Sequence, residues 1–216
     1  EVLTSLAEQP AIELRDVVKT FDAITAVNGL HLTVPRGIVM GLLGPNGAGK
    51  STTMRMLTGQ STPTSGTIEV LGLPMPKQSK LARARMGVVP QLDNLETELT
   101  ARENLSFFGR MQGLSGARLQ ERVAACLAIA RLQDLADRHV DTYSGGLKRR
   151  LNLVIGLIHE PQLLILDEPT VGIDPQSRNF IHEALRTLHE SGMTILYTTH
   201  YMEEAENLCD DIAIID

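Results

Sequence analysis

Aromatic residues and cysteines are scarce in this sequence. Among its 216 residues there is no tryptophan, and aromatic residues make up only 3%. The two cysteines, Cys126 and Cys209, each lie in a segment of apolar periodicity. We therefore expect two buried free thiols, as in a reducing compartment, rather than a disulfide or a metal-binding pair.

Long hydrophobic runs and strong basic clusters are also missing. The longest apolar stretches are well short of the roughly 20 residues that a membrane span needs, and no signal peptide is evident. The net charge is −6, and no stripe of lysine and arginine suggests binding to nucleic acid. The densest basic cluster, residues 148–150, is interpreted as a solvated helix face. Any membrane role is therefore expected to be peripheral, through a partner.

The overall composition is that of a soluble globular domain, with 43% hydrophobic and 21% charged residues. The length is sufficient to bury one full core. Residues 1–10 show no periodicity and are expected to form a loose lead-in. The sequence stops at Asp216 directly after an apolar strand, so we expect a fragment of a longer protein that is truncated at its C-terminus.

Residues 44–51 read Gly-Pro-Asn-Gly-Ala-Gly-Lys-Ser, which fits the G-x-x-x-x-G-K-[ST] phosphate loop. Glycines let the backbone curl so that successive N–H groups converge on one anion. Lys50 would reach the terminal phosphates, and the Ser51 hydroxyl would ligate Mg²⁺. An apolar strand precedes the loop and a helix follows it, so the phosphates would lie at a helix N-terminus. A chance glycine-rich turn would not explain this context, and the pattern therefore predicts nucleotide binding.

Hydrophobic periodicity predicts strands that alternate with helices. We expect strands over residues 11–18, 30–34, 38–43, 67–70, 84–89, 163–166, 193–198 and 212–215, and helices over 51–57, 176–190 and 201–209. Residues 93–141 have helical spacing with Gly113 and Gly116 as separators, which predicts an inserted helical subdomain. Ser144 is expected to cap the helix that follows. This order predicts an α/β domain with a largely parallel sheet.

Several polar residues follow predicted strands, at the sheet edge where α/β proteins bind ligands. Asp167 would hold Mg²⁺ through water, and Glu168 would orient or deprotonate the attacking water. Gln91 could sense Mg²⁺ or the water, although a polar turn residue is the alternative. His200 could donate a hydrogen bond to a phosphate oxygen, although an ordinary histidine at a strand end is the alternative.

Two further features suit a nucleotide. Ser144, Gly145 and Gly146 open a predicted helix and expose consecutive N–H groups, which makes a second candidate anion site. Plain helix capping is the alternative. One chain would rarely bring both anion sites to one phosphate, but two copies arranged head to tail could. Phe21 could stack on an adenine ring, with a core phenylalanine as the alternative.

The order of these motifs resembles the nucleotide-binding domain of ABC transporters over about residues 11–216. The resemblance is carried, in order, by Phe21, residues 44–51, Gln91, residues 143–147, residues 163–168, residues 172–174 and His200. It implies a P-loop NTPase (RecA-like) core with a mainly parallel sheet, an N-terminal antiparallel β subdomain and an inserted α-helical subdomain. The implied core comprises residues 11–92 and 146–216, and the implied helical signature subdomain comprises residues 93–145.

The resemblance also implies a role for each motif residue. Phe21 would stack on adenine, and the Walker A loop would consist of Gly44, Pro45, Asn46, Gly47, Ala48, Gly49, Lys50, Ser51 and Thr52. The implied Mg²⁺ ligands are Ser51, the Q-loop Gln91 and the Walker B Asp167. The implied catalytic residues are Glu168, the switch His200, Lys50 and Gln91. Ser144, Gly145 and Gly146 would contact ATP bound to a second copy, and Asp174 is the D-loop aspartate.

The implied activity is hydrolysis of ATP with Mg²⁺, coupled to transport. The implied partners are an identical second nucleotide-binding domain and an integral-membrane permease, with residues 93–108 facing the permease, and no nucleic acid. The chain would then lie peripherally on the cytoplasmic side of the cell membrane. The Tyr-Ser-Gly-Gly signature with its basic residues, together with residues 199–205, resembles exporters of the multidrug, antibiotic-resistance and lipo-oligosaccharide (nodulation-factor) type.

The signature departs from the usual Leu-Ser-Gly-Gly-Gln of the family, because it reads Tyr-Ser-Gly-Gly-Leu at residues 143–147 and Leu147 takes the place of glutamine. Leucine cannot make the polar contact of glutamine, although the Ser-Gly-Gly core is intact. The alternative function is a non-transport ABC ATPase that acts on nucleic acid or the ribosome, which usually carries large insertions or basic surfaces. A catalytically dead regulatory domain is disfavoured because Lys50, Asp167, Glu168 and His200 are all present.

Overall fold

The N-terminal strands pair into an antiparallel sheet in the order β2-β1-β4-β5. The computed structural model describes residues 9–216, so the lead-in predicted over residues 1–10 falls almost wholly outside the described residues. The first two strands are longer than predicted, because the hairpin between them keeps pairing up to Phe21 and Ile24. The sheet consists of β1 (Ile12–Phe21), β2 (Ile24–Val34), β4 (Ser65–Val70) and β5 (Leu73–Met75).

A second sheet is wholly parallel, in the order β6-β7-β8-β3-β9. Two of its inner strands, β3 and β8, are buried at every residue, as expected for strands covered on both faces. Register pairs Leu43 with Thr199 and Asp167 with Thr198, so the carboxyl ends of β3, β7 and β8 meet at one edge. The strands are β3 (Val39–Leu43), β6 (Met86–Val89), β7 (Leu163–Asp167), β8 (Thr194–Thr199) and β9 (Asp211–Ile214).

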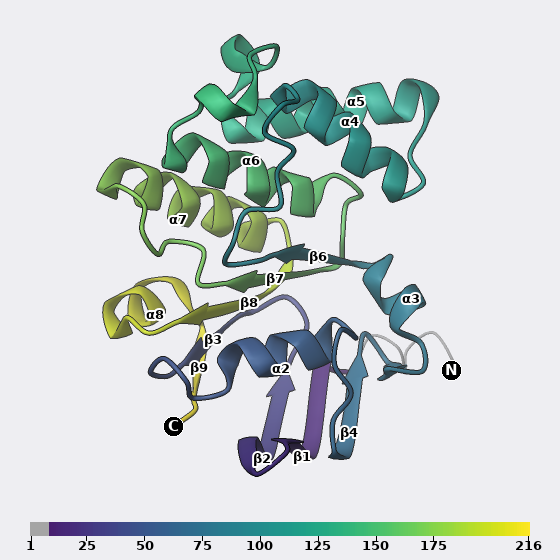
Figure 1. The fold of residues 1–216 in the computed structure, drawn as a ribbon, viewed down its shortest axis with the longest axis vertical. Coiled ribbons are helices and arrows are strands. Elements are labelled where there is room, and N and C mark those ends of the chain that lie inside the picture. The colour runs from purple at the N-terminus through teal and green to yellow at the C-terminus, as the bar shows by residue number, and fades with distance from the viewer. Residues whose placement is uncertain (1–8) are drawn as a thin grey trace.

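Helices separate and cover the two sheets (Figure 1). α2 (Lys50–Leu57) contacts both β7 and the antiparallel sheet, so it lies between the sheets. The opposite side of the parallel sheet carries α6 (Gly145–Leu157) and α7 (Pro175–Glu190), and α4 (Ala101–Met111) and α5 (Gly116–Ala130) pack beyond α6. The remaining elements are α3 (Ser79–Arg83), α8 (Met202–Leu208) and the 3₁₀ turns η1 (Gln133–Leu135) and η2 (Val140–Thr142).

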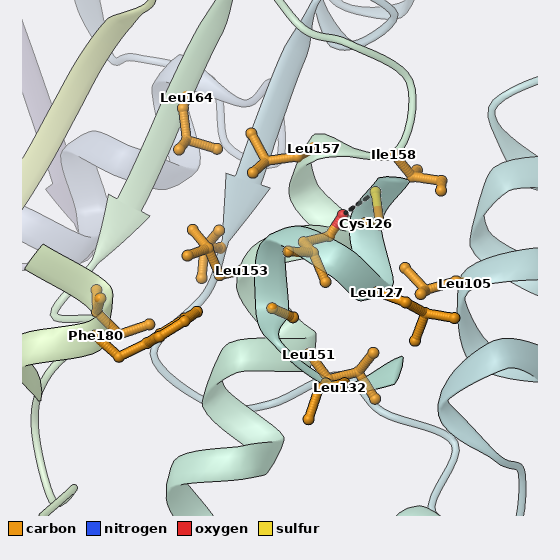
Figure 2. Packing of buried hydrophobic residues seen from close by; sticks show 14 of the residues in the cluster. Leu105, Cys126, Leu127, Leu132, Leu151, Leu153, Leu157, Ile158, Leu164 and Phe180 are labelled. Carbon is orange, nitrogen blue, oxygen red and sulfur yellow. Dashed lines mark hydrogen bonds between the residues drawn. The ribbon is translucent and has the colours of Figure 1, made fainter. Parts of the chain in front are cut away.

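The parallel sheet contributes alternate side chains to two separate hydrophobic clusters. Leu42 and Ile165 point to the cluster formed with α2 and the antiparallel sheet. Leu164 and Leu166 point to the cluster formed with the helices α4 to α7. Figure 2 shows side chains of this second cluster. The period-2 alternation of strands thus joins both halves of the molecule through one sheet.

Both cysteines are free, as predicted, but only Cys126 is buried; the prediction of burial is wrong for Cys209, which is half-buried. Cys126 is buried and its Sγ donates a hydrogen bond to the Val154 carbonyl oxygen over 3.4 Å (Figure 2). Burial raises the pKa of the Cys126 thiol to about 11 and that of the half-buried Cys209 thiol to about 12. Both thiols therefore stay protonated at neutral pH and are unreactive.

The α/β fold class, with its parallel and antiparallel sheets, is confirmed, while a few local predictions differ. Strand β5 and helix α3 were not predicted, because each is too short to show periodicity. Gly116 begins α5 instead of separating two helices. Within residues 9–216, no helix combines the length and the apolar character that crossing a membrane requires.

Candidate nucleotide site

The phosphate loop joins β3 to α2 and depends on its glycines. Gly47 and Gly49 adopt φ angles of 89° and 94°, in the left-handed region that glycine tolerates. A Cβ at Gly49 would also lie 2.5 Å from the Ala26 carbonyl oxygen of β2. Gly49 is the N-cap of α2 and has no side-chain cap. The first N–H groups of this helix are therefore available to an anion.

The buried Lys50 and Glu168 form the charged centre of the site. Lys50 Nζ donates to the carbonyl oxygens of Gly44 (2.6 Å) and Pro45 (2.9 Å) in its own loop. The same Nζ lies 3.3 Å from Oε1 of Glu168, and both side chains are less than a tenth exposed. The Lys50 ammonium therefore already contacts oxygen acceptors, which phosphate oxygens could replace.

A cavity of about 330 Å³ opens above this pair. It brings together residues from four separate segments: Ala26, Asn46, Gly47, Gly49, Lys50, Ser51, Thr52, Gln91 and Glu168. Ala26 gave no signal in the sequence, since only pairing within the antiparallel sheet brings β2 to the loop. Gly44, Pro45 and Ala48 belong to the loop but do not line the cavity.

The three predicted magnesium ligands line a second, adjoining cavity. Ser51, Gln91 and Asp167 all contribute to this space of about 260 Å³, and Ser51 and Gln91 line both cavities. Hydroxyl, amide and carboxylate oxygens are the hard donors that Mg²⁺ prefers. Among the described residues, no three His, Cys, Asp or Glu side chains cluster to hold a metal by themselves. The donor set therefore fits an ion that also binds phosphate oxygens and water.

Glu168 is held in an unusual backbone conformation. Its φ is 46°, in the left-handed region that non-glycine residues rarely adopt. The Glu168 N–H donates to Thr198 Oγ1 (2.9 Å), and that hydroxyl in turn donates to Asp167 Oδ1 (2.8 Å). Thr198 therefore positions both acidic residues. No sequence pattern indicated this role, because a threonine in a buried strand is ordinary.

Two more predicted residues converge on the Glu168 carboxylate. His200 Nδ1 lies 3.3 Å from Oε1, and Gln91 Nε2 donates to Oε2 over 3.5 Å. The His200 ring also packs against the Tyr201 ring at a centroid distance of 4.0 Å. The carboxylate thus lies among Lys50, Gln91 and His200, as the ends of β3, β6, β7 and β8 require.

The structure does not bring every predicted residue to the cavity. Phe21 is 46% exposed at the end of β1, with Lys19 Nζ 4.8 Å from its ring centroid. This exposure excludes the alternative that Phe21 is a core residue, but Phe21 does not line the cavity. Its role in stacking on adenine stays a prediction.

The signature segment lies at the start of α6, outside both cavities. Ser144 caps the helix by accepting a hydrogen bond from the Leu147 N–H over 3.3 Å, as predicted. Leu147 packs half-buried against the helical cluster. Gly146 is buried where any Cβ would overlap the Ser177 side chain, whereas Gly145 faces open space. The two glycines therefore have different surroundings within one chain.

Asp174 is the N-cap of α7. Its carboxylate accepts a hydrogen bond from the Ser177 N–H over 2.9 Å. Hydrogen bonds from Ser177 lower the pKa of Asp174, so the side chain is ionised at neutral pH. The D-loop role of this residue stays a prediction.

The interpretation of residues 148–150 as a solvated helix face is wrong. Arg149 is only 3% exposed, and the guanidinium of Arg150 lies 4.2 Å from the Phe180 ring centroid. The helical spacing could have indicated that Arg149 is buried, because Gly146, Arg149 and Leu153 recur on one buried face of α6. The charge of the cluster concealed that signal.

Comparisons with known proteins agree with this geometry. The family model for ABC transporters matches residues 27–171. Nod factor export ATP-binding protein I of Rhizobium meliloti (strain 1021) is 52% identical over 206 residues, which are 95% of this chain and 62% of that protein. The protein of the same name from Paraburkholderia xenovorans (strain LB400) is 51% identical over 96% of this chain and 68% of its own length. The chain thus spans about two thirds of the length of these relatives.

Solved structures of ABC transporter cassettes also have a fold similar to that of this chain. CbiO1 from Clostridium perfringens, part of the cbiONQ transporter complex, has a TM-score of 0.88 and 28% identity, over 97% of this chain and 86% of that chain. A dimeric bacterial ABC transporter cassette, MJ0796, has a TM-score of 0.85 and 27% identity, over 94% of each chain. A post-hydrolysis state of that cassette with ADP and Pi has a TM-score of 0.85 and 26% identity, over 95% of this chain and 94% of that chain.

Proposed function

This chain belongs to the ABC transporter family, and from that premise we propose that it binds and hydrolyses Mg-ATP to drive export through a separate permease. One observation carries the proposal. The Glu168 carboxylate lies at the mouth of the phosphate loop, within 3.5 Å of Lys50, Gln91 and His200. A carboxylate that can orient water, beside a cation and two polar side chains that can stabilise charge, suits hydrolysis of a terminal phosphate.

In binding, the nucleotide phosphates occupy the loop at the N-terminus of α2. Lys50 exchanges the carbonyl oxygens of Gly44 and Pro45 for phosphate oxygens, and its contact with Glu168 loosens. The carboxylate is then free to accept a hydrogen bond from water. Adenine stacks on Phe21, whose exposed ring is accessible to a ligand.

Ser51, Gln91 and Asp167 would hold Mg²⁺, which would neutralise the charge that develops on the phosphate oxygens. Thr198 fixes the Asp167 carboxylate through a 2.8 Å hydrogen bond, so this ligand enters the reaction already oriented.

In hydrolysis, Glu168 orients the attacking water and accepts its proton, while His200 donates a hydrogen bond to a γ-phosphate oxygen. The strained backbone of Glu168 aims its carboxylate into the cavity. These roles are supported by proximity, because His200 Nδ1 lies 3.3 Å from Oε1 of Glu168.

A second copy of the chain completes the site. Ser144, Gly145 and Gly146 lie outside the cavity of their own chain, so their N–H groups would serve the ATP of a partner arranged head to tail. The likeness to a dimeric cassette supports this arrangement. The partner's signature would stabilise charge on the γ-phosphate.

Export through a permease is supported by the relatives, which are named as ATP-binding proteins of Nod factor export. The chain would lie peripherally on the cytoplasmic face of the membrane. Residues 93–108, which include most of α4, would contact the permease. Co-purification with a membrane protein instead of nucleic acid distinguishes this function from a non-transport ATPase.

The first test is Mg-ATPase turnover of the purified chain as a function of its concentration. We expect turnover to rise faster than linearly, because each site needs two copies. Glu168→Gln should lower turnover at least about 100-fold and trap an ATP-dependent dimer visible by light scattering. Glu203→Gln, at an exposed position of α8, is the matched control and should behave like wild type. Linear turnover without a dimer would contradict the proposal.

A further inference from the structure

One buried arginine joins the signature helix to both catalytic loops. Arg149 lies one turn into α6, and its guanidinium is in the interior of the molecule with 3% of the residue exposed. It uses all three nitrogens. Nε donates to the Pro169 carbonyl oxygen (2.6 Å), Nη2 to that of Glu168 (3.0 Å), and Nη1 to the carbonyl oxygens of Pro90 (2.9 Å) and Gln91 (3.0 Å) and to Asp93 Oδ1 (3.0 Å).

The two loops need such a donor. Pro90 follows β6 and Pro169 follows Glu168, and proline has no N–H with which to continue a hydrogen-bond ladder. The Pro169 carbonyl oxygen is buried and would be costly to leave unpaired, whereas that of Pro90 also accepts a longer hydrogen bond from Asn152 Nδ2 (3.5 Å). The planar guanidinium has five N–H groups in a fixed arrangement, which lysine cannot reproduce. Asp93 supplies the only counter-charge within this set of contacts.

The contacts with Glu168 matter most. On one side of this residue the backbone N–H is held by Thr198, and on the other the carbonyl oxygen is held by Arg149. Between these two restraints the backbone has a φ of 46°. Without Arg149 the carbonyl oxygen would keep only the longer hydrogen bond from the Val171 N–H (3.3 Å), and the residue could relax toward an ordinary conformation, which redirects the carboxylate.

We propose that Arg149 is a positioning residue for hydrolysis: it fixes the main chain at Glu168 and Gln91 relative to α6, the helix that begins with Ser144–Gly146. The inference rests on the proposed function and adds a residue to it. Because one rigid side chain spans three segments, a displacement of α6 moves both loops together. The signature end of the helix is thereby mechanically linked to the groups that act on the γ-phosphate of the same chain.

The other end of α6 offers a matched control. Arg122 of α5 has a side chain that is 12% exposed, and it donates to the carbonyl oxygens of Leu157 and Ile158 (3.1 Å each). It also pairs with Glu160 at 3.3 Å. Arg122 is therefore a largely buried guanidinium that donates to carbonyl oxygens at the C-terminal end of α6, but it lines neither cavity.

Steady-state kinetics of Arg149→Met and Arg122→Met separate positioning from stability. At a temperature where both variants are folded by circular dichroism, we expect Arg149→Met to lower kcat between about 10- and 100-fold, with the KM for ATP changed less than about threefold. The kcat of Arg149→Lys should lie between those of Arg149→Met and wild type, because an ammonium reaches only some of the acceptors. Arg122→Met should keep kcat within about twofold of wild type. Equal kcat for Arg149→Met and wild type would overturn the inference.

Hydrogen exchange tests the same inference without hydrolysis. In the ATP-free protein, Arg149→Met should speed exchange in peptides covering residues 90–93 and 168–171, and Arg122→Met only in peptides near residues 157–160. Unchanged exchange at both loops in Arg149→Met would overturn the positioning role. An inactive wild-type chain whose exchange responds as stated would contradict the proposed function alone, so the two failures are distinguishable.

Discussion

Two adjacent glycines of α6, Gly145 and Gly146, have opposite steric surroundings. A Cβ at Gly146 would overlap Oγ of Ser177 and lie 2.7 Å from its Cβ, whereas one at Gly145 would meet nothing within 4 Å. Gly146 is therefore required by packing between α6 and α7 within one chain. This requirement exists in addition to any contact with a nucleotide held by a partner.

This difference predicts different stabilities for two alanine variants. Gly146→Ala should lower the free energy of unfolding by roughly 1–3 kcal/mol, because the overlap forces α6 and α7 apart. Gly145→Ala should change it by less than about 1 kcal/mol in either direction, because alanine fits the helix and the space is open. Urea unfolding of both variants measures this. Equal destabilisation by the two substitutions would show that the contact with Ser177 is unimportant.

A half-buried histidine, His159, gives the molecule a pH dependence. Burial lowers the pKa of His159, whose Nε2 lies 3.0 Å from the Met86 carbonyl oxygen. Between the ordinary pKa of 6.5 and the lowered native value, the unfolded chain binds more protons than the folded one. Stability should therefore fall as the pH drops below about 6.5. Burial lowers the pKa of His182 as well, which adds to the same trend.

His159→Gln should weaken this dependence. Glutamine keeps an N–H donor for Met86 but does not titrate, so the loss of stability between pH 7 and pH 5 should be smaller than in wild type. Unfolding in urea at the two pH values gives the comparison. His182 retains its contribution, so a residual dependence is expected. A variant with the full wild-type dependence would exclude His159 as a source.

At the scale of elements, α4 begins with a complete capping box. Thr100 Oγ1 accepts a hydrogen bond from the Glu103 N–H (3.1 Å), and Glu103 Oε2 accepts one from the Thr100 N–H (2.8 Å). The sequence pattern Thr-x-x-Glu is sufficient for this motif, because all its atoms lie within four consecutive residues. It fixes the start of the helix that follows the Gln91 loop.

Thr100→Ala should therefore cost about 1 kcal/mol of stability, within a range of roughly 0.5–2. Glu103→Gln keeps the acceptor of the box and should cost clearly less. Thermal unfolding of the two variants beside wild type measures both effects. If Thr100→Ala were neutral, water would be replacing the cap and the box would contribute nothing to the stability of α4.

At the scale of the whole molecule, the two hydrophobic clusters share the parallel sheet. Adjacent residues of β7 point into different clusters, so neither cluster is complete without the sheet. We expect both halves to unfold in one transition. Tyr143 and Tyr197 belong to the helical cluster, and near-ultraviolet circular dichroism of tyrosine reports on that half.

Leu14→Ala tests this coupling by a change in the cluster that lacks the two tyrosines. Leu14 is 1% exposed in the antiparallel sheet, and its truncation should cost about 2–5 kcal/mol. The tyrosine signal and the far-ultraviolet signal should shift together to lower denaturant, because the shared sheet transmits the loss. Leu151→Ala in the helical cluster is the reciprocal variant. Two separated transitions would show that the halves unfold independently.

The sequence by itself determined the fold class, the phosphate loop and the order of the motifs. Each of these depends on information that is local in the chain. Glycine spacing sets backbone curvature, alternation and helical periodicity set the elements, and residues directly after apolar strands reach the same sheet edge. The gathering of Lys50, Gln91, Glu168 and His200 could be predicted on that basis, and their catalytic roles stay predictions.

Tertiary structure alone decided how those residues are held. Arg149 was misread as a surface residue because its acceptors lie about 20 and 60 residues away, beyond the reach of any local pattern. The hydrogen bonds of Thr198 to Asp167 and Glu168, and the contact of Ser177 with Gly146, also join residues far apart in the sequence. A buried polar side chain is fixed by whichever segments packing places beside it. Local sequence thus specified the reactive groups, and long-range packing decided the restraints that aim them.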